Sequence, residues 1–300
     1  MNFLNAELSP RIAYLMVGAA ASIWGMLWWP MRVVADLGVP PMWVNAFFLL
    51  LPAMTLGVFG WRSLINSRAH WRAILAVGVF IGGGFVLYSL GIIIASVSKT
   101  TVLFYLTPIW ATVFGLFVLG ESLTLQRVSA IVLALLGCGL VMQVNPLNIA
   151  FEKVDLLGLG SGLLWGIGSV IIRRFPDIPY LSISFAQYVI GSLIAISAAL
   201  ILDVPFPPAE TLVYAIPISF LFAVVVLLPS VLVILRVSQY VSPGLVAILM
   251  LSEVLVAVVS SWWLLGETLS VWQWGGVIAI LATGVWLGLS ANDEAPAKAS

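Results

Sequence analysis

The stretch "LVAILMLSEVLVAVVSSWWLLGE", residues 245–267, is a long apolar run with one ionisable side chain near its middle, Glu253. A helix that crosses the hydrocarbon core of a bilayer needs about 20 predominantly apolar residues. The run has that length, so it predicts a membrane-spanning helix. A carboxyl at such a depth is energetically costly, which makes Glu253 a candidate functional residue.

The composition of the whole chain points the same way. Of its 300 residues, 62% are hydrophobic and 8% are charged, and the mean hydropathy is +1.17. Soluble domains carry about 25% charged residues. The sequence therefore predicts an all-α membrane protein with ten transmembrane helices. We expect these helices at residues 11–34, 42–61, 71–95, 100–119, 125–143, 156–173, 180–202, 211–235, 242–265 and 271–290.

The distribution of basic residues predicts the orientation, because Lys and Arg accumulate in cytoplasmic loops. With a cytoplasmic N-terminus, nine basic residues fall on the cytoplasmic side and three outside. The nine are Arg11, Arg62, Arg68, Arg72, Arg127, Arg173, Arg174, Arg236 and Lys298, and the three are Arg32, Lys99 and Lys153. We therefore expect a multi-pass protein of the cell (inner) membrane with both termini cytoplasmic.

The chain also repeats itself. "LTPIWATVFGLFVLGESLT" (106–124) is similar to "LSEVLVAVVSSWWLLGETLS" (251–270). The Gly-Glu pairs in these runs align at an offset of 146 residues, and Pro108 aligns with Glu253 at an offset of 145. Five helices per unit force the second copy to enter the membrane from the opposite face. The expected organisation is a first repeat (1–150), a second, inverted repeat (151–290) and a disordered cytoplasmic tail (291–300), with a central cavity between the halves, as in many secondary transporters.

These motifs resemble those of a known family. Two five-helix halves, "LGE" closing the fourth helix of each, and "YLTP" and "LSE" ahead of them are similar to the drug/metabolite transporter superfamily, in particular its ten-helix EamA-type exporters. The resemblance covers residues 11–290. It implies a secondary transporter of small metabolites, and "FYLTPIW" (104–110) is similar to exporters of amino acids, aromatic ones included. The commoner family pattern has proline at Glu253, so no role of that proline carries over.

Two residues near the middle of predicted helices carry the main mechanistic hypotheses. Glu253 either faces a wet cavity or stays protonated, and it is a candidate proton site or partner of a substrate amine; a packing role is the alternative. Pro108 removes a backbone hydrogen bond and frees the carbonyl of Phe104, which must find another partner or line a cavity. Pro108 is therefore a candidate hinge, with a static kink as the alternative.

Further side chains complete the expected cavity for an apolar, zwitterionic solute. They are Trp24, Tyr88, Tyr105, Thr107, Trp165 and Gln187. Trp28 is expected in the interfacial aromatic belt, and Asn45 close to the interface. Glu121 and Glu267 are expected to accept hydrogen bonds from the first turn of the helix that follows each of them, a structural role to which gating is the alternative.

Other function classes lack their motifs. There is no metalloprotease, nucleophile-elbow or paired-aspartate motif, so an intramembrane enzyme is the least favoured alternative. The single His70 and single Cys138 predict no metal site, and no cofactor is expected.

No basic residue lies deep in a predicted span, so we expect an uncharged or zwitterionic small-molecule substrate rather than a phosphate compound. A flippase for lipid-linked substrates and a passive channel stay open, as does the choice between proton coupling and facilitated diffusion. The lipid bilayer is the expected environment; nucleic acid is not expected as a partner, and the chain is expected to be a monomer.

Overall fold

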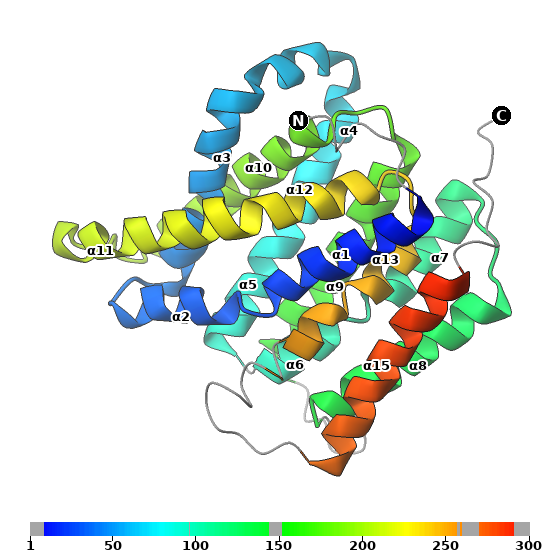
Figure 1. The fold of residues 1–300 in the computed structure, drawn as a ribbon. Coiled ribbons are helices and arrows are strands. Elements are labelled where there is room, and N and C mark those ends of the chain that lie inside the picture. The colour runs from blue at the N-terminus through cyan, green and yellow to red at the C-terminus, as the bar shows by residue number, and fades with distance from the viewer. Residues whose placement is uncertain (1–8, 96, 144–151, 257–258, 260–269, 291–300) are drawn as a thin grey trace.

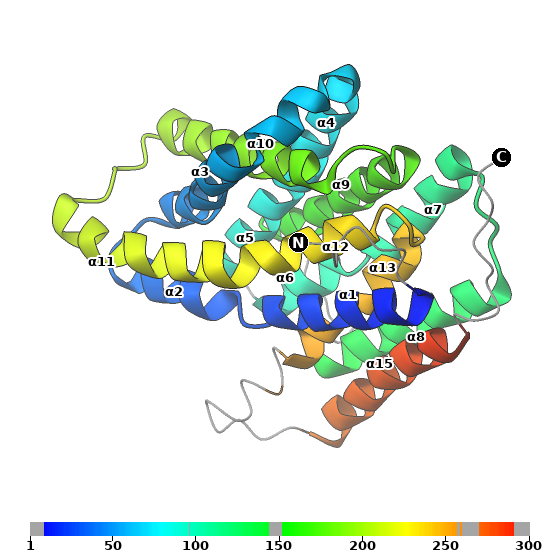
Figure 2. The same ribbon diagram turned by 45° about the horizontal axis from the view of Figure 1, so that its top comes forward.

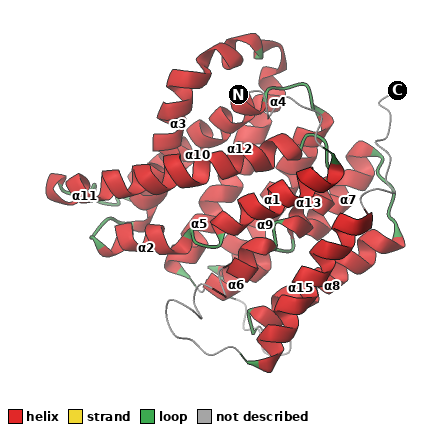
Figure 3. Ribbon diagram, in the orientation of Figure 1, coloured by secondary structure: helices red, strands yellow, loops and turns green. Residues whose placement is uncertain are grey.

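The computed structural model of the protein describes residues 9–95, 97–143, 152–256, 259 and 270–290. Every regular element within these ranges is helical, and they contain no strand (Figure 3). The prediction of an all-α fold is therefore confirmed for the described part of the chain.

The helices follow the predicted apolar spans, and several spans consist of consecutive helical segments. In chain order they are α1 Pro10–Trp24, α2 Trp28–Asp36, α3 Pro41–Asn66, the 3-10 turn η2 Arg68–His70, α4 Trp71–Val77, the π segment η3 Gly78–Gly82, α5 Gly83–Ile94, α6 Val97–Phe104, α7 Thr107–Leu119, α8 Leu125–Val141, α9 Asp155–Arg174, α10 Tyr180–Ile201, α11 Ala209–Phe220, the π segment η4 Leu221–Leu227, α12 Leu228–Val237, α13 Pro243–Leu249 and α15 Val271–Ser290.

Many of these stretches are suited to a bilayer. By length and composition, seven helical stretches among the described residues can cross a membrane: Pro10–Asp36, Pro41–Phe59, Arg68–Ile94, Thr100–Leu119, Asp155–Arg174, Tyr180–Ile201 and Ala209–Val237. Three shorter helices are also apolar: Leu125–Val141, Pro243–Val256 and Val271–Leu287. The described residues therefore supply seven to ten apolar helices, at the places where the sequence predicts spans.

The predicted span 100–119 is interrupted. Helix α6 ends at Phe104 and α7 begins at Thr107, with Tyr105 and Leu106 in the turn between them. Pro108 thus lies in the first turn of a new helix, where the missing N–H leaves no bond unmade. The expectation of a proline in the middle of a continuous helix is corrected, because the chain leaves the helix before the proline.

The predicted span 242–265 has a similar interruption without a proline. Helix α13 ends at Leu249, Met250 and Leu251 form a turn, and residues 252–256 are helical again. The amide of Glu253 donates to the carbonyl of Met250 at 3.0 Å, a tight turn of the 3-10 kind. Glu253 therefore lies just beyond a break in this span, two residues after Leu251.

Helices far apart in the sequence pack together. Helix α3 packs on α10, α8 on α15, α5 on α9, and α1 on α12. Figures 1 and 2 show α8 and α15 side by side along one edge of the bundle. Helix α9 also packs on α6 and α7, and α13 packs on α7 and α1.

Small residues allow the closest of these approaches. A Cβ added at Gly162 of α9 would lie 2.5 Å from the carbonyl oxygen of Phe104, and one at Gly158 would lie 2.7 Å from that of Thr100. Only glycine leaves room for this backbone contact. The consecutive small residues of α9 therefore bring it directly against the interrupted α6–α7 span.

Asn45, whose position close to the membrane interface stays a prediction, has a fully buried side chain. Its Nδ2 donates to the carbonyl of Val86 at 3.1 Å, and its Oδ1 accepts from the hydroxyl of Ser89 at 2.7 Å. A buried amide must be hydrogen-bonded to be tolerated. Asn45 satisfies this requirement by tying α3 to α5.

Candidate functional site

The buried carboxyl of Glu253 is the centre of the candidate site. Its residue is only 3% exposed. The hydroxyl of Tyr88, on α5, donates to Oε1 at 2.6 Å, and the hydroxyl of Tyr105, between α6 and α7, donates to Oε2 at 2.6 Å. Distances this short are typical of hydrogen bonds to a charged carboxylate. Each carboxyl oxygen thus has its own phenol, and the three side chains come from three separate segments.

Tyr105 makes a second contact. Its hydroxyl lies 2.9 Å from the carbonyl oxygen of Met250, at the break that precedes Glu253. Tyr88 also has a second neighbour, the hydroxyl of Thr101, but at 3.5 Å. Tyr105 therefore joins the break between α6 and α7 to the break after α13.

Aromatic rings surround these phenols. Trp24 meets Trp165 edge-on at a centroid distance of 5.5 Å, and the Trp24 indole N–H donates to the hydroxyl of Ser230 at 3.0 Å. Phe104 lies 4.6 Å from the ring of Tyr88 and 6.1 Å from that of Trp165. The arrangement brings together four of the predicted cavity aromatics, which are Trp24, Tyr88, Tyr105 and Trp165.

A small pocket opens beside the carboxyl. It is lined by Trp24, Gly25, Trp28, Tyr88, Ile92, Thr101 and Glu253. Its cavity volume is about 20 Å³, which is room for one water molecule. Small-molecule sites usually enclose about 300–1,000 Å³. This pocket is therefore closed to a solute in the conformation described.

Trp28 was expected in the interfacial aromatic belt, and the structure adds a contact that the sequence did not predict. Helix α1 ends at Trp24, and the turn through Gly25 places Trp28, the first residue of α2, in the pocket lining. No lysine or arginine belongs to that lining. The chemistry available at this pocket is one carboxyl, aromatic rings and a threonine hydroxyl.

Comparison with known proteins places this arrangement in a family. The model of the EamA-like transporter family matches the chain twice, over residues 11–143 and 152–289. The chain belongs to the EamA-like transporter family. It is thus an integral, multi-pass membrane protein of a family that transports small molecules.

Two further similarities accompany the family match. The chain is 25% identical over 196 residues to "Uncharacterized transporter YoaV" of Bacillus subtilis (strain 168). That alignment covers 63% of this chain and 66% of the Bacillus protein, just under two thirds of its length. A solved crystal structure of another protein, 16% identical, superposes with a TM-score of 0.70 over 94% of this chain and 98% of that one. The second similarity concerns the fold alone.

In this EamA-like transporter, Thr107 lies beside the site rather than in the pocket lining. Its hydroxyl donates to the carbonyl of Phe104 at 2.5 Å, and the carbonyl of Gly162 is 3.2 Å away. The carbonyl that the sequence predicts to be freed by Pro108 is therefore satisfied by the preceding threonine. Pro108 is buried in the first turn of α7, and its role as a hinge stays a prediction.

Gln187 lies apart from the carboxyl. It is on α10, it is fully buried, and neither its Oε1 nor its Nε2 has a hydrogen-bond partner among the described residues. Its backbone faces Gly82 of η3. The structure therefore does not bring Gln187 into the Glu253 pocket, although its side chain remains polar and unsatisfied within the bundle.

Sequence reasoning missed Met250 and Thr101. Met250 contributes through its backbone carbonyl, which no side-chain pattern reveals. A weak signal existed, because the offset of 145 that aligns Pro108 with Glu253 also aligns Tyr105 with Met250. Thr101 is one of two consecutive threonines in an otherwise apolar span, and nothing in the sequence distinguishes it from its neighbour.

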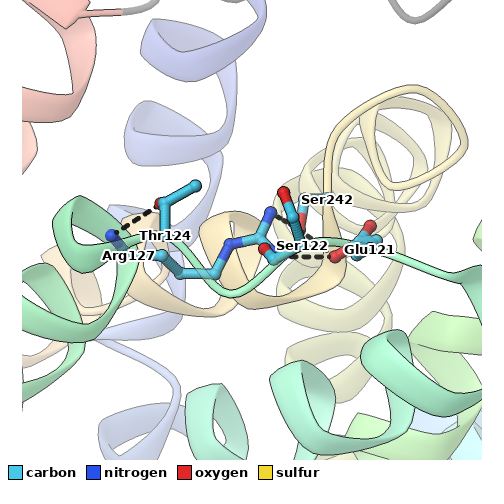
Figure 4. A network of polar contacts seen from close by, with 5 residues as sticks. All are labelled: Glu121, Ser122, Thr124, Arg127 and Ser242. Atoms are coloured by element: carbon cyan, nitrogen blue, oxygen red, sulfur yellow. Dashed lines mark hydrogen bonds and ion pairs between the residues drawn. The ribbon is translucent and has the colours of Figure 1, made fainter.

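A second polar cluster lies at the junction of α7 and α8 (Figure 4). Arg127 donates from Nη1 to Glu121 Oε2 at 2.8 Å and from Nη2 to the hydroxyl of Ser242 at 2.8 Å. Ser242 in turn donates to Glu121 Oε2 at 2.9 Å. Gly120, at φ +67°, permits the sharp exit from α7 that directs Glu121 into the cluster. We call these three residues, Glu121, Arg127 and Ser242, the clasp.

The clasp refines the expectation for Glu121. The partner comes from the first turn of the next helix, as expected, and it is the guanidinium of Arg127. Ser242, the residue before α13, adds a contact from a distant part of the sequence. Glu267, for which the same role was expected, lies outside the described residues.

Among the described residues, no group of three or more His, Cys, Asp and Glu side chains could hold a metal ion.

Proposed function

We propose that the chain is a secondary transporter, not an enzyme, that works by alternating access of two inverted five-helix halves. The substrate we propose is a small uncharged or zwitterionic metabolite, and the activity is export of neutral or aromatic amino acids. The proposal extends the family membership with a specific architecture, substrate class and direction.

Paired hydrogen bonds support the two halves. Thr107 lies near the carbonyl of Gly162 at 3.2 Å, and Ser252 donates to that of Gly18 at 2.7 Å. Thr107 and Ser252 are repeat equivalents at the offset of 145. Their acceptors lie on α9 and α1, the first helices of the two proposed halves. The same contact thus occurs twice, once in each direction between the halves.

A second pair of contacts agrees with this symmetry. Arg32, in the middle of α2, donates to the carbonyl of Ile92 at 3.3 Å, and Arg173, near the end of α9, donates to that of Gln239 at 2.8 Å. The two arginines are repeat equivalents at an offset of 141. In each proposed half, this hydrogen bond joins the end of the first membrane span to the end of the third span of the same half.

The helix packing has the same two-fold character. The third span of the first half packs on the first of the second half (α5 on α9), and the reciprocal pair is α12 on α1. The second spans pack on one another (α3 on α10), as do the fifth (α8 on α15). On the basis of this packing we propose that the two halves are residues 1–150 and 151–290. We further propose that the protein lies in the inner membrane with both termini cytoplasmic, because of the distribution of its basic residues.

The closed pocket favours a carrier over a passive channel. Among the described residues, the space that Glu253 faces, midway along a predicted span, has a volume of about 20 Å³. Alternating access requires a state of this kind, in which the site is shut from at least one side. A channel would need a wider connected opening to conduct.

The pocket lining supports the proposed substrate class. A carboxyl beside tryptophan and tyrosine rings suits a solute that carries an amino group next to an apolar side chain. The aromatic faces attract the cationic amino group, and the carboxyl accepts its hydrogen bonds. The absence of lysine and arginine from the lining argues against phosphate compounds. Glu253 is the residue that we propose to bind the coupling proton.

Counterflow in proteoliposomes tests the proposed function. Vesicles preloaded with an unlabelled neutral or aromatic amino acid are diluted into a trace of the labelled compound, with protein-free vesicles as the control. We expect a transient accumulation of label inside above its equilibrium level, because a carrier exchanges solute for solute.

Two results would contradict the proposal in different ways. Rapid equilibration without an overshoot would indicate a channel. Absence of any uptake across the amino-acid set would reject the substrate class, and a flippase assay with a fluorescent lipid would then test the remaining alternative.

A further inference from the structure

The hydroxyl of Tyr105 has two acceptors within reach and one proton to donate. Glu253 Oε2 is 2.6 Å from it and the Met250 carbonyl oxygen is 2.9 Å from it. A phenol donates one hydrogen bond at a time. The choice between the two acceptors therefore depends on whether Glu253 carries a proton.

The two protonation states can be worked out from these distances. With Glu253 ionised, Tyr88 donates to Oε1 and Tyr105 donates to Oε2, while the Met250 carbonyl retains only the amide of Glu253. When a proton from water binds at Oε2, the new O–H donates to the Tyr105 oxygen. The Tyr105 proton then turns to the Met250 carbonyl, and Tyr88 still donates to Oε1.

The alternative position for the acid proton, on Oε1 of Glu253, has a poorer hydrogen-bond acceptor further along the chain of bonds. A proton on Oε1 would donate to Tyr88, whose own proton would then need the hydroxyl of Thr101 at 3.5 Å. That separation is longer than an ordinary O–H···O bond of about 2.5–3.0 Å. The Tyr105 side, with its acceptor at 2.9 Å, is the better position for the proton.

Tyr105 and Met250 also occupy special positions in the fold. They lie at the breaks of the two interrupted spans, one in each proposed half, and they are repeat equivalents at the offset of 145. A hydrogen bond between them therefore joins the two halves at matching points. We propose that Tyr105 is a positioning residue that converts protonation of Glu253 into a hydrogen bond across these two breaks.

Other titratable groups around Glu253 do not duplicate this role. Besides the two phenols, the buried thiol of Cys138 lies on α8, which packs on α13. Arg32, in the middle of α2, donates to the carbonyl of Ile92, a residue of the pocket lining. The remaining charged residues on the neighbouring elements lie in terminal turns. They are Asp36 of α2, Arg11 of α1, Lys99 of α6, Arg127 of α8, Asp155, Arg173 and Arg174 of α9, and Arg236 of α12.

The inference deepens the proposed function by assigning a residue to its proton-coupling step. Isotope-edited infrared difference spectroscopy tests it without any substrate, so its outcome is independent of the substrate assignment. The full-length protein in lipid is labelled with carbonyl-¹³C methionine and titrated with acid. Its eight methionines carry the label, and Met250→Leu removes the signal of Met250 alone.

We expect a carboxylic acid band that grows on acidification and disappears in Glu253→Gln. A shift of the ¹³C carbonyl band should follow the same titration and be lost in Met250→Leu. Tyr105→Phe should keep the acid band and lose the carbonyl shift. Tyr88→Phe is the matched control, because it also removes one phenol from the carboxyl but should keep the carbonyl shift.

Three results would overturn the inference. One is a carbonyl shift that persists in Tyr105→Phe, and another is its loss to the same extent in Tyr88→Phe. The third is the absence of a carbonyl response in the wild type, with or without titration of the carboxyl. None of these would affect the counterflow result, so failure of this inference and failure of the proposed function are distinguishable.

Discussion

At the scale of single residues, Glu253 is held where two phenols can reach it. The donors Tyr88 and Tyr105 each lie 2.6 Å from one carboxyl oxygen. A buried polar group left without its partner costs about 1–3 kcal/mol, whereas removal of both partners together is close to neutral. The three side chains should therefore behave as a coupled unit.

Tyr88→Phe tests this coupling. We expect it to lower the free energy of unfolding by about 1–3 kcal/mol in the wild type, because Oε1 loses its donor. In a Glu253→Leu background the same change should cost much less, because no carboxyl is left to satisfy. Reversible unfolding in mixed micelles measures both costs, and equal costs in the two backgrounds would contradict the coupling.

Sequence reasoning reached part of this residue-scale arrangement. The cost of a carboxyl in an apolar span identified Glu253, and aromatic residues deep in predicted spans identified Tyr88 and Tyr105. It did not place Trp28, because a break after Trp24 is not encoded by any proline. It grouped Gln187 with the cavity because polarity alone does not give the direction of a side chain on a helix.

At the scale of helices, backbone contact at glycine controls how closely α9 meets the α6–α7 break. The Cβ of an alanine at Gly162 would lie 2.5 Å from the Phe104 carbonyl oxygen and 3.1 Å from the Thr107 hydroxyl oxygen. The carbonyl belongs to the backbone and cannot rotate away. The two helices would have to separate.

Gly162→Ala should therefore destabilise the fold by about 1–3 kcal/mol, the usual cost of overpacking. Gly139→Ala is the matched control, since a Cβ there has no neighbour within 4 Å. That change is expected to be neutral or slightly stabilising, because alanine favours the helix. Thermal unfolding in detergent compares the two, and equal effects would argue against the close contact.

The clasp connects elements of the two proposed halves. The side chains of Arg127 and Glu121 are 11% and 16% exposed, so their ion pair is largely shielded from water. Removing either partner should cost about 1.5–3 kcal/mol, the range for hydrogen bonds to charged groups. The double variant Arg127→Ala, Glu121→Ala should cost clearly less than the sum of the two single changes.

A double-mutant cycle by thermal unfolding checks this expectation. Additive costs would show that the contact between Arg127 and Glu121 contributes nothing to stability. The repeat equivalent of Arg127, at an offset of 147, is Trp274, so the second half has no arginine at the matching position. The sequence thus predicts no second clasp at the repeat-equivalent place, and we expect loss of the clasp to affect one face of the membrane.

At the scale of the molecule, the apolar spans could be predicted well and the interruptions could not. Runs of about 20 apolar residues leave few alternatives to helices in a bilayer. The break at Met250 and Leu251 contains no glycine or proline, and its hydrogen bond comes from Tyr105, in the turn between α6 and α7, which is distant in the sequence. The seven long and three shorter apolar helices agree with the predicted spans because hydrophobic length, unlike a break, is a local property.

The orientation is a molecule-scale prediction. With nine of the twelve basic residues on the side of the N-terminus, reporters fused to either terminus should be active only in the cytoplasm. Paired fusions of a cytoplasm-dependent and a periplasm-dependent reporter measure this. Opposite locations for the two termini would require an odd number of spans and would exclude two five-helix halves.

The most direct test of proton-coupled alternating access compares two modes of transport in the same preparation of vesicles. Wild type and Glu253→Gln are assayed for counterflow at equal pH and for accumulation driven by a pH gradient. The amide preserves the shape of the side chain but cannot exchange a proton. We expect the wild type to show both activities, and the ratio of gradient-driven accumulation to counterflow to fall at least tenfold in Glu253→Gln. Gradient-driven accumulation by Glu253→Gln at the wild-type ratio would contradict the assignment of Glu253 as the proton site.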